Sequence, residues 1–526
     1  MKNKTDIIEQ RRIGLQAELD AQKTQAERNR LGQFATPSGL AEDVLAFAQT
    51  LVSKSEQVRF LDPAIGTGSF YAALCKVFPK GRIGSAVGFE IDRHYGEPAA
   101  RLWKHANLKI HLADFTHAKP QRRFNLVICN PPYVRHHHLE NGEKQHLHVA
   151  TMQASGMKLS GLAGLYCHFL GLSHAWMEDG AIAGWLIPSE FMDVNYGRAL
   201  KHYLLHRVTL LRVHRFDPND VQFADALVSS AVVWIRNAPP PPNHRVSFTF
   251  GGSLAQPQLS REISTASLAR EPKWTRFPRN GVRLNNEGPV LSDFFQIKRG
   301  LATGDNSYFI VSEDELSARN LPRELFIPIL PSPRYLPQNE IVADNQRNPK
   351  VDRRLFLLDT RLSEGEIKRR YPTLYEYLGE GKRRKLHERY LCQHRSPWYA
   401  QEDRPPAPIV CTYLGRSDRE GKKPFRFILN ASRATVANVY LAMYPTERLA
   451  RAMERDNNLI RMVWNALNHL APERVLGEGR VYGGGLHKLE PKELGNVPVP
   501  EIASLLPSKD KLTHKQSELF VNSQAL

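Results

Sequence analysis

Between residues 57 and 237, short apolar runs alternate with helical stretches, and this alternation restricts the possible folds more than any other feature of the chain. Strands that alternate regularly with helices favour a parallel sheet with helices on both faces. We predict strands over 58–61, 86–89, 108–112, 124–129, 180–187 and 226–235. The predicted fold class is therefore α/β.

The chain of 526 residues is too long for one compact core, so two or three domains are expected. Four consecutive prolines at 239–242 predict a linker, because proline lacks the N–H donor that helices and sheets need. The predicted organisation is an N-terminal helix at 1–30, an α/β domain at 31–237, a Pro-rich linker and connecting segment at 238–290, and a basic domain at 291–526. The N-terminal helix, expected to end at Gly32, could pack on the α/β domain or mediate association.

The formal net charge of +18 favours a polyanionic partner such as nucleic acid, although a merely basic soluble protein could have the same balance. The five cysteines are scattered and form no CxxC pair, which argues against a disulfide framework or structural zinc and fits a reducing cytoplasm. The N-terminus has no apolar core of a signal peptide, and no stretch approaches the roughly 20 apolar residues that cross a bilayer. No membrane association is expected.

The strand predicted at 124–129 runs directly into Asn130-Pro131-Pro132-Tyr133. Ligands bind at the strand ends of open α/β sheets. The amino group of adenine is a poor nucleophile because its lone pair is delocalised into the ring. The Asn130 side-chain oxygen and a proline-bounded backbone carbonyl could accept its hydrogens and localise that lone pair, and Tyr133 offers a flat face to an extruded base. A simple Asn-Pro turn after a strand is the alternative interpretation.

A glycine loop follows the first predicted strand in the run DPAIGTGSF at 62–70. Gly66 and Gly68 let the backbone approach a ligand closely. Such a loop also suits NAD, but Tyr71 stands where the dinucleotide motif has a small residue.

Acidic residues follow the next two predicted strands. Glu90 could accept hydrogen bonds from ribose hydroxyls, while Asp114 and Phe115 could bind an adenine amino group and stack on its ring. Taken singly, Glu90 and Asp114 could be solvated loop acids. Their order along three strand ends, together with the glycines, favours a binding site.

In this order, the motifs resemble those of gamma-class amino-methyltransferases, the DNA adenine methyltransferases similar to the TaqI enzyme. The resemblance extends from about residue 31 to 500 and includes GQFATP at 32–37, DPAIGTGSF at 62–70, FEID at 89–92, ADF at 113–115, NPPY at 130–133, LYCHFL at 165–170, DGAIAGWLIP at 179–188, KRGLATGDN at 298–306 and YGGGLHKLEPK at 482–492. It implies a Rossmann-like S-adenosylmethionine-dependent methyltransferase fold with a mostly parallel seven-stranded sheet. A C-terminal target-recognition domain of mixed α+β structure is implied to follow it.

The resemblance also implies roles for individual residues. The implied cofactor-binding residues are Thr36, Pro37, Asp62, Ala64, Gly66, Glu90, Asp114, Phe115 and Phe169. The implied catalytic residues are Asn130, Pro131, Pro132, Tyr133 and Phe223, the last contacting the second face of the flipped base. The implied reaction is direct in-line transfer of a methyl group to the target amino nitrogen in double-stranded DNA, with no covalent enzyme intermediate and no metal.

Other functions are compatible with parts of this pattern. NPPY also occurs in methyltransferases that modify RNA adenine or a glutamine of protein release factors, although the large basic C-terminal domain argues against these. A DNA-binding module without catalysis and a fused nuclease are further alternatives. No nuclease cluster is evident, so a separate cognate restriction endonuclease is the expected partner. We expect a monomer or weak dimer in a bacterial or archaeal cytoplasm.

The histidines at 136–138, with His146 and His148, invite a metal hypothesis, but their spacing suits zinc poorly and a contact with DNA is the alternative. Basic clusters at 368–370 and 382–385 could be solvated helix faces or DNA contacts. Tyr390, Trp398 and Tyr399 nearby favour the second possibility.

Overall fold

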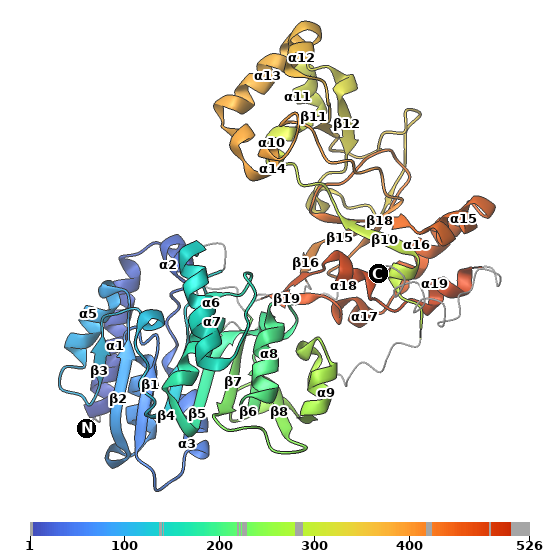
Figure 1. The fold of residues 1–526 in the computed structure, drawn as a ribbon. Coiled ribbons are helices and arrows are strands. Elements are labelled where there is room, and N and C mark those ends of the chain that lie inside the picture. Colours follow the sequence, from blue (N-terminus) through green and yellow to red (C-terminus); the bar gives the residue numbers. More distant parts are fainter. Residues whose placement is uncertain are drawn as a thin grey trace. The chain divides into compact units, whose positions relative to one another are not determined.

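The computed structural model describes residues 4–135, 139, 141–217, 220, 222, 229–278, 288–416, 423–482 and 485–506 (Figure 1). The chain forms two compact units. The first comprises Met1–Leu284 and Tyr482–Gly485, and the second comprises Asn285–Val481 and Leu486–Leu526.

A nine-stranded sheet, counted over the described residues, forms the centre of the first unit, with strand order β3-β2-β1-β4-β5-β7-β6-β8-β9. The strands are β1 Val58–Asp62, β2 Ile83–Phe89, β3 Lys109–His111, β4 Phe124–Cys129, β5 Met177–Pro188, β6 Thr209–Arg215, β7 Ser230–Arg236, β8 Arg245–Gly252 and β9 Pro257–Ser264. Strands β3, β2, β1, β4 and β5 run parallel, whereas β7 is antiparallel to both β5 and β6. The predicted Rossmann-like α/β fold is confirmed.

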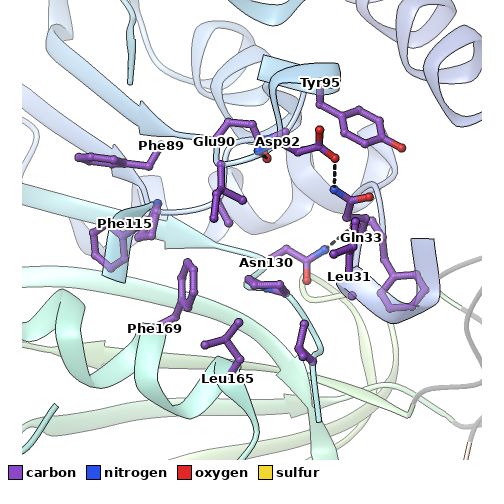
Figure 2. A pocket seen from close by; sticks show the side chains of 18 of the residues that line it. Leu31, Gln33, Phe89, Glu90, Asp92, Tyr95, Phe115, Asn130, Leu165 and Phe169 are labelled. Atoms are coloured by element: carbon purple, nitrogen blue, oxygen red, sulfur yellow. Dashed lines mark hydrogen bonds between the residues drawn. The ribbon is translucent and has the colours of Figure 1, made fainter. Parts of the chain in front are cut away.

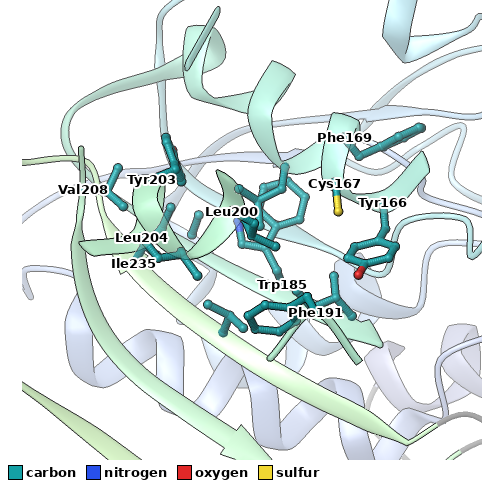
Figure 3. Close-up of a cluster of buried hydrophobic side chains, with 14 of the residues drawn as sticks. Tyr166, Cys167, Phe169, Trp185, Phe191, Leu200, Tyr203, Leu204, Val208 and Ile235 are labelled. Carbon is teal, nitrogen blue, oxygen red and sulfur yellow. The ribbon is translucent and has the colours of Figure 1, made fainter. Parts of the chain in front are cut away.

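Helices cover both faces of this sheet because successive strand residues point to opposite sides. In β4, Leu126 and Ile128 pack with buried side chains of α3, α4 and α5, whereas Val127 and Cys129 pack with those of α6, α7 and α8. Figure 3 shows part of the second cluster, with Trp185 of β5 packed among side chains of α7 and α8. The helices of this unit are α1 Lys4–Ala21, α2 Gln25–Leu31, α3 Ser38–Leu51, α4 Ser69–Val77, α5 Arg93–Leu102, α6 Asn141–Ser155, α7 Leu165–Ser173, α8 Gly197–His206 and α9 Thr265–Arg270.

The prediction of seven strands is wrong in number. Strand β6, which the sequence analysis did not identify, carries the polar residues Arg212 and His214, both buried. Both contact β8: Thr249 Oγ1 accepts from Arg212 Nε at 3.1 Å and lies 2.9 Å from His214 Nδ1. Strands β8 and β9 lie within the segment 238–290 that was predicted to be connecting, so this segment extends the sheet. Of the strand predicted at 226–235, residues 226–228 lie outside the described residues.

The predicted single N-terminal helix is two helices. Thr24 interrupts it by capping α2: its Oγ1 accepts from the Glu27 N–H at 3.3 Å, and its own N–H donates to Glu27 Oε2 at 2.8 Å. This reciprocal capping box starts a new helix. Helix α2 ends at Gly32, as predicted, with the glycine in the left-handed conformation at φ 64°.

The second unit has the predicted mixed α+β structure. Its sheets, in order, are β10-β18-β15-β17-β13, β11-β14-β12 and β16-β20-β19. The strands are β10 Phe295–Arg299, β11 Ile310–Ser312, β12 Phe326–Ile329, β13 Glu340–Ile341, β14 Leu355–Leu358, β15 Ile409–Thr412, β16 Leu414–Arg416, β17 Phe427–Asn430, β18 Tyr440–Pro445, β19 Arg480–Tyr482 and β20 Leu486–Lys488. The helices are α10 Asn306–Phe309, α11 Glu313–Ala318, α12 Glu364–Arg370, α13 Pro372–Arg383, α14 Tyr390–Gln393, α15 Glu447–Arg455, α16 Leu459–His469, α17 Pro472–Leu476, α18 Pro491–Gly495 and α19 Pro500–Leu505. No helix within the described ranges has both the length and the apolar character needed to cross a bilayer.

Candidate active site

A pocket of about 1030 Å³ lies at the carboxyl ends of β1, β2 and β4 (Figure 2). It brings together predicted residues from five separate motifs of the first unit. The predicted residues that line it are Ala64, Gly66, Glu90, Asp114, Phe115, Asn130, Pro132 and Phe169.

The glycine loop between β1 and α4 has the conformation that its glycines allow. Gly66 and Gly68 have φ values of 55° and 94°, in the left-handed region that favours glycine. A Cβ on Gly68 would come within 2.6 Å of Trp103 Nε1, whereas a Cβ on Gly66 would meet no atom within 4 Å. Gly66 lines the pocket, so the absence of a side chain there leaves room for a ligand close to the backbone.

Two carboxyl groups lie at the base of this loop. Asp62 is buried and accepts the N–H of Ala64 at 3.1 Å, and burial raises its pKa to about 8. Glu90 accepts the N–H groups of Gly66 at 3.0 Å and Asp92 at 2.9 Å. Burial raises the pKa of Glu90 to about 7 despite these hydrogen bonds. Glu90 is thus fixed between the first two strand ends, with its carboxyl group in the pocket wall.

The part of the pocket beyond β3 is aromatic. Phe115 is buried, with ring centroids 5.4 Å from Phe89 and 5.5 Å from Phe169. Asp114 precedes it and uses Oδ1 to accept both the N–H and the hydroxyl of Thr116, at 2.8 and 2.7 Å. These bonds fix the carboxylate at the pocket edge. A flat heterocycle with a polar edge fits this surface.

Asn130 is held by its amide nitrogen. Nδ2 donates to the Phe34 carbonyl at 2.9 Å and to Thr36 Oγ1 at 3.2 Å. A carbonyl can only accept, so the amide orientation is determined. Asn130 Oδ1 is buried and accepts no hydrogen bond from any described residue. A buried acceptor without a partner is costly and points to a ligand donor.

Five other predicted residues lie elsewhere. Thr36 lies behind Asn130, and Asp62 lies beneath the glycine loop. Pro37 starts α3 and borders a separate hollow of about 460 Å³. Pro131 is buried in the loop, and Tyr133 donates its hydroxyl to the Leu186 carbonyl at 3.1 Å while packing on Phe34. Phe223 lies outside the described residues.

The N-terminal helices form a wall of the pocket that the sequence analysis did not assign. Gln16, Asp20, Lys23 and Arg30 line it. Gln16 Oε1 accepts the hydroxyl of Thr67 in the glycine loop at 2.7 Å, and Lys23 forms an ion pair with Asp92 after β2. The polar residues 16 and 20, four positions apart on one face of α1, were the available signal. Lys23 lies in the turn between α1 and α2. Of the two alternatives for this segment, packing on the α/β domain is what the structure shows.

A buried ion pair secures that wall. Arg12 is 3% exposed and binds both carboxylate oxygens of Glu9, at 2.7 and 2.8 Å. It also donates to Thr67 Oγ1 and to Ser38 Oγ, each at 3.1 Å. Helix α1 is therefore joined to the glycine loop and to the start of α3.

The histidines give no metal cluster in the part of the chain that the structure describes, where no three His, Cys, Asp or Glu side chains converge. His146 stacks on His117 with ring centroids 4.3 Å apart, and His148 stacks on the buried His168. His136, His137 and His138 lie outside the described residues.

The aromatic residues beside the basic clusters differ in exposure. Tyr390 is 74% exposed, whereas Tyr399 is buried and donates its hydroxyl to the Leu362 carbonyl at 2.5 Å. Trp398 is packed against the core that includes Tyr308. Of these three, Tyr390 is the one whose ring is available to a partner.

Two families match this chain. Residues 280–525 match the type II methyltransferase M.Eco57I, C-terminal domain, and residues 91–222 match the Eco57I restriction-modification methylase.

Individual relatives span most of the chain. It is 28% identical over 494 residues to type II methyltransferase M.XamI of Xanthomonas campestris pv. amaranthicola, covering 90% of this chain and 86% of the relative. It is 25% identical to type II methyltransferase M.AccI of Acinetobacter calcoaceticus, covering 89% and 85%. Among solved structures, the type IIL restriction-modification enzyme MmeI in complex with DNA is similar over 81% of this chain and 61% of its own, with 12% identity and a TM-score of 0.48.

Proposed function

The chain belongs to the type II restriction-modification methyltransferases, and we propose that it methylates the exocyclic amino group of adenine in a specific sequence of double-stranded DNA. The observation that carries this proposal is the buried Oδ1 of Asn130 at the edge of the pocket, which accepts no hydrogen bond from the residues that the structure describes. An amino group can donate the hydrogen bond that this oxygen could accept. A carbon nucleophile, such as C5 of cytosine, has none to give.

The cofactor is S-adenosylmethionine, and the pocket fits it by the chemistry of its walls. The aromatic part, with Phe115 and Phe169, would receive the adenine ring. Glu90 would accept hydrogen bonds from the ribose, and the space over Gly66 would receive the methionine chain. When bound, the cofactor supplies an electrophilic methyl group on a sulfonium.

Asn130 then orients the nucleophile. Its Oδ1 accepts one hydrogen of the target amino group, and the prolyl-bounded carbonyl of the same loop accepts the other. The nitrogen lone pair is thereby turned toward the methyl carbon. With the cofactor bound, the nitrogen would take the methyl group, the sulfur would keep the electron pair of the broken C–S bond, and the surplus proton would leave the nitrogen for solvent. Asn130 holds this geometry because its own amide is fixed by Phe34 and Thr36.

The target adenine must leave the DNA helix for this to occur, since its amino group is paired inside a duplex. Tyr133, Pro131 and Phe223 are the residues we propose to contact the extruded base. In this proposal the second unit, which carries the basic clusters on α12 and α13, reads the sequence. A separate endonuclease completes the restriction-modification pair.

The test is transfer of radiolabelled methyl groups from S-adenosylmethionine to duplex DNA, RNA or protein, followed by nucleoside analysis. We expect label in duplex DNA as N6-methyladenine, and none with Asn130→Ala, which should still bind cofactor. Label in RNA or protein only would overturn the DNA substrate, and label in N4-methylcytosine would overturn the adenine assignment.

A further inference from the structure

The charges that line the pocket do not match the cofactor at its methionine end. S-adenosylmethionine carries a carboxylate there, beside an ammonium and the sulfonium. The charged residues of the pocket wall are mainly acidic, which suits the two cationic groups but opposes the carboxylate. The acidic residues that line it are Asp20, Glu90, Asp92, Asp114 and Glu143.

The glycine loop has few backbone donors left for an anion. The N–H of Ala64 donates to Asp62, and that of Ile65 donates to the Phe89 carbonyl at 2.9 Å. The N–H of Gly66 donates to Glu90, and that of Gly68 donates to the Ile65 carbonyl at 2.9 Å. A loop whose amides are used in this way is poorly suited to bind a carboxylate, so a side-chain cation is needed.

Two cationic side chains, Lys23 and Arg30, are found among the described residues that line the pocket. Lys23 is already neutralised, because it is ion-paired with Asp92 and also lies 4.9 Å from the centroid of the Tyr95 ring. Arg30 is exposed and makes no hydrogen bond or ion pair with any described residue. Arg30 is therefore the cation available to a ligand.

The position of Arg30 in the chain suits this role. It precedes Leu31 and Gly32 at the end of α2, and the left-handed cap at Gly32 turns the chain into the segment that holds Asn130. Figure 2 shows Leu31 and Gln33 on the pocket wall beside Asn130. The methionine carboxylate is separated from the reactive sulfonium by a short aliphatic chain, so a long side chain from this wall can reach it.

We propose that Arg30 binds the α-carboxylate of S-adenosylmethionine through a charge-assisted hydrogen bond. The N-terminal helices would then take part in cofactor binding directly. The inference rests on the proposed cofactor site, but it does not depend on whether the methyl acceptor is DNA adenine.

Calorimetric titration of the full chain with two ligands tests the proposal. For Arg30→Gln, we expect affinity for S-adenosylmethionine to fall about 10- to 100-fold, the range of one charge-assisted hydrogen bond. Decarboxylated S-adenosylmethionine, which lacks the group at issue, should bind Arg30→Gln and the unaltered protein equally. Arg30→Lys should recover part of the loss. Arg11→Gln, an exposed arginine of α1 that does not line the pocket, is the matched control and should bind both ligands normally.

Other outcomes would overturn the assignment. An equal loss of affinity for both ligands would mean that Arg30 acts through the structure of α2. Unchanged affinity for both would mean that another group binds the carboxylate. Weaker duplex binding with unchanged cofactor affinity would assign Arg30 to DNA phosphate. Failure of the unaltered protein to bind S-adenosylmethionine would instead overturn the proposed function itself.

Discussion

At the scale of single residues, the site depends on the orientation of the Asn130 side-chain amide. The Phe34 carbonyl and Thr36 Oγ1 accept the hydrogens of Asn130 Nδ2, and none of the described residues donates a hydrogen bond to Oδ1. The sequence predicted that Asn130 accepts a hydrogen bond from the target. The two groups that orient it come from a segment about ninety-five positions earlier in the chain, and only the fold could show their contact with Asn130.

Thr36→Val should lower the methyl-transfer rate without weakening cofactor binding. Valine has the same shape but cannot accept the hydrogen bond at 3.2 Å, so the Asn130 amide loses one of its two fixed contacts. We expect kcat to fall about 5- to 10-fold, the value of one hydrogen bond of about 1 kcal/mol. Single-turnover kinetics with saturating cofactor measure this. Thr50→Val on the exposed side of α3 is the control, and an equal effect there would contradict the account.

Glu90 should make the cofactor-free protein less stable as pH rises. Burial raises its pKa from 4.5 to about 7, so the folded state binds a proton that the unfolded state has released. The contribution of Glu90 to the free energy of unfolding should therefore decline between these values, by on the order of 2 kcal/mol, and level off above pH 7. Asp62 extends a similar decline toward pH 8. Glu90→Gln, which mimics the protonated acid, should flatten the profile between pH 5 and 7 in urea titrations. An unchanged slope would contradict the pKa shift.

At the scale of elements, strand β4 was predicted with its observed ends, because it is apolar throughout and ends at a proline-containing turn. Strand β6 was missed because a buried arginine and histidine look like surface residues until β8 supplies their partners. The break at Thr24 followed a readable Thr-x-x-Glu pattern that the periodic apolar residues on either side obscured. The sequence therefore predicted β4, whose pattern is local, and missed β6, which a distant segment completes. The break at Thr24 is also local, but the flanking apolar residues hid it.

Arg12→Met should destabilise the first unit and weaken the cofactor site together. It leaves the Glu9 carboxylate, 17% exposed, without its charge partner and removes the bond to Thr67. Losing one member of a buried ion pair costs about 3 kcal/mol or more. Denaturant unfolding should show this loss, and the double variant Glu9→Leu with Arg12→Met should recover much of the stability without restoring cofactor affinity. A single variant as stable as the unaltered protein would rule out this role for α1.

At the scale of the whole molecule, the chain joins a site for chemistry to a separate basic unit. The net charge of +18 makes binding to DNA electrostatic in part, but net charge does not tell which cations contact phosphate. The structure divides these cations into those that form ion pairs and those that do not. Lys368, Arg369 and Arg370 on α12 are exposed and form no ion pair within the described ranges. Lys382, Arg319 and Arg354 are paired with Glu364, Glu380 and Glu313.

Two triple variants with equal net charge test this distinction. Lys368→Gln, Arg369→Gln and Arg370→Gln together should reduce the slope of log affinity for duplex DNA against log salt by up to about 3, because each phosphate contact contributes about 0.9. Lys382→Gln, Arg319→Gln and Arg354→Gln together should change the slope much less. Fluorescence anisotropy over a salt series measures both. Equal slopes for the two triples would mean that overall charge alone attracts the DNA.

The most direct measurement for the central claim is the position of methyl groups in DNA treated with the protein. Unmethylated plasmid would be incubated with S-adenosylmethionine and either the unaltered protein or Asn130→Ala, and then read by single-molecule sequencing. We expect N6-methyladenine at one position of a single short motif, and none with the variant. Methyl groups on another base, or N6-methyladenine that persists in Asn130→Ala, would contradict the account.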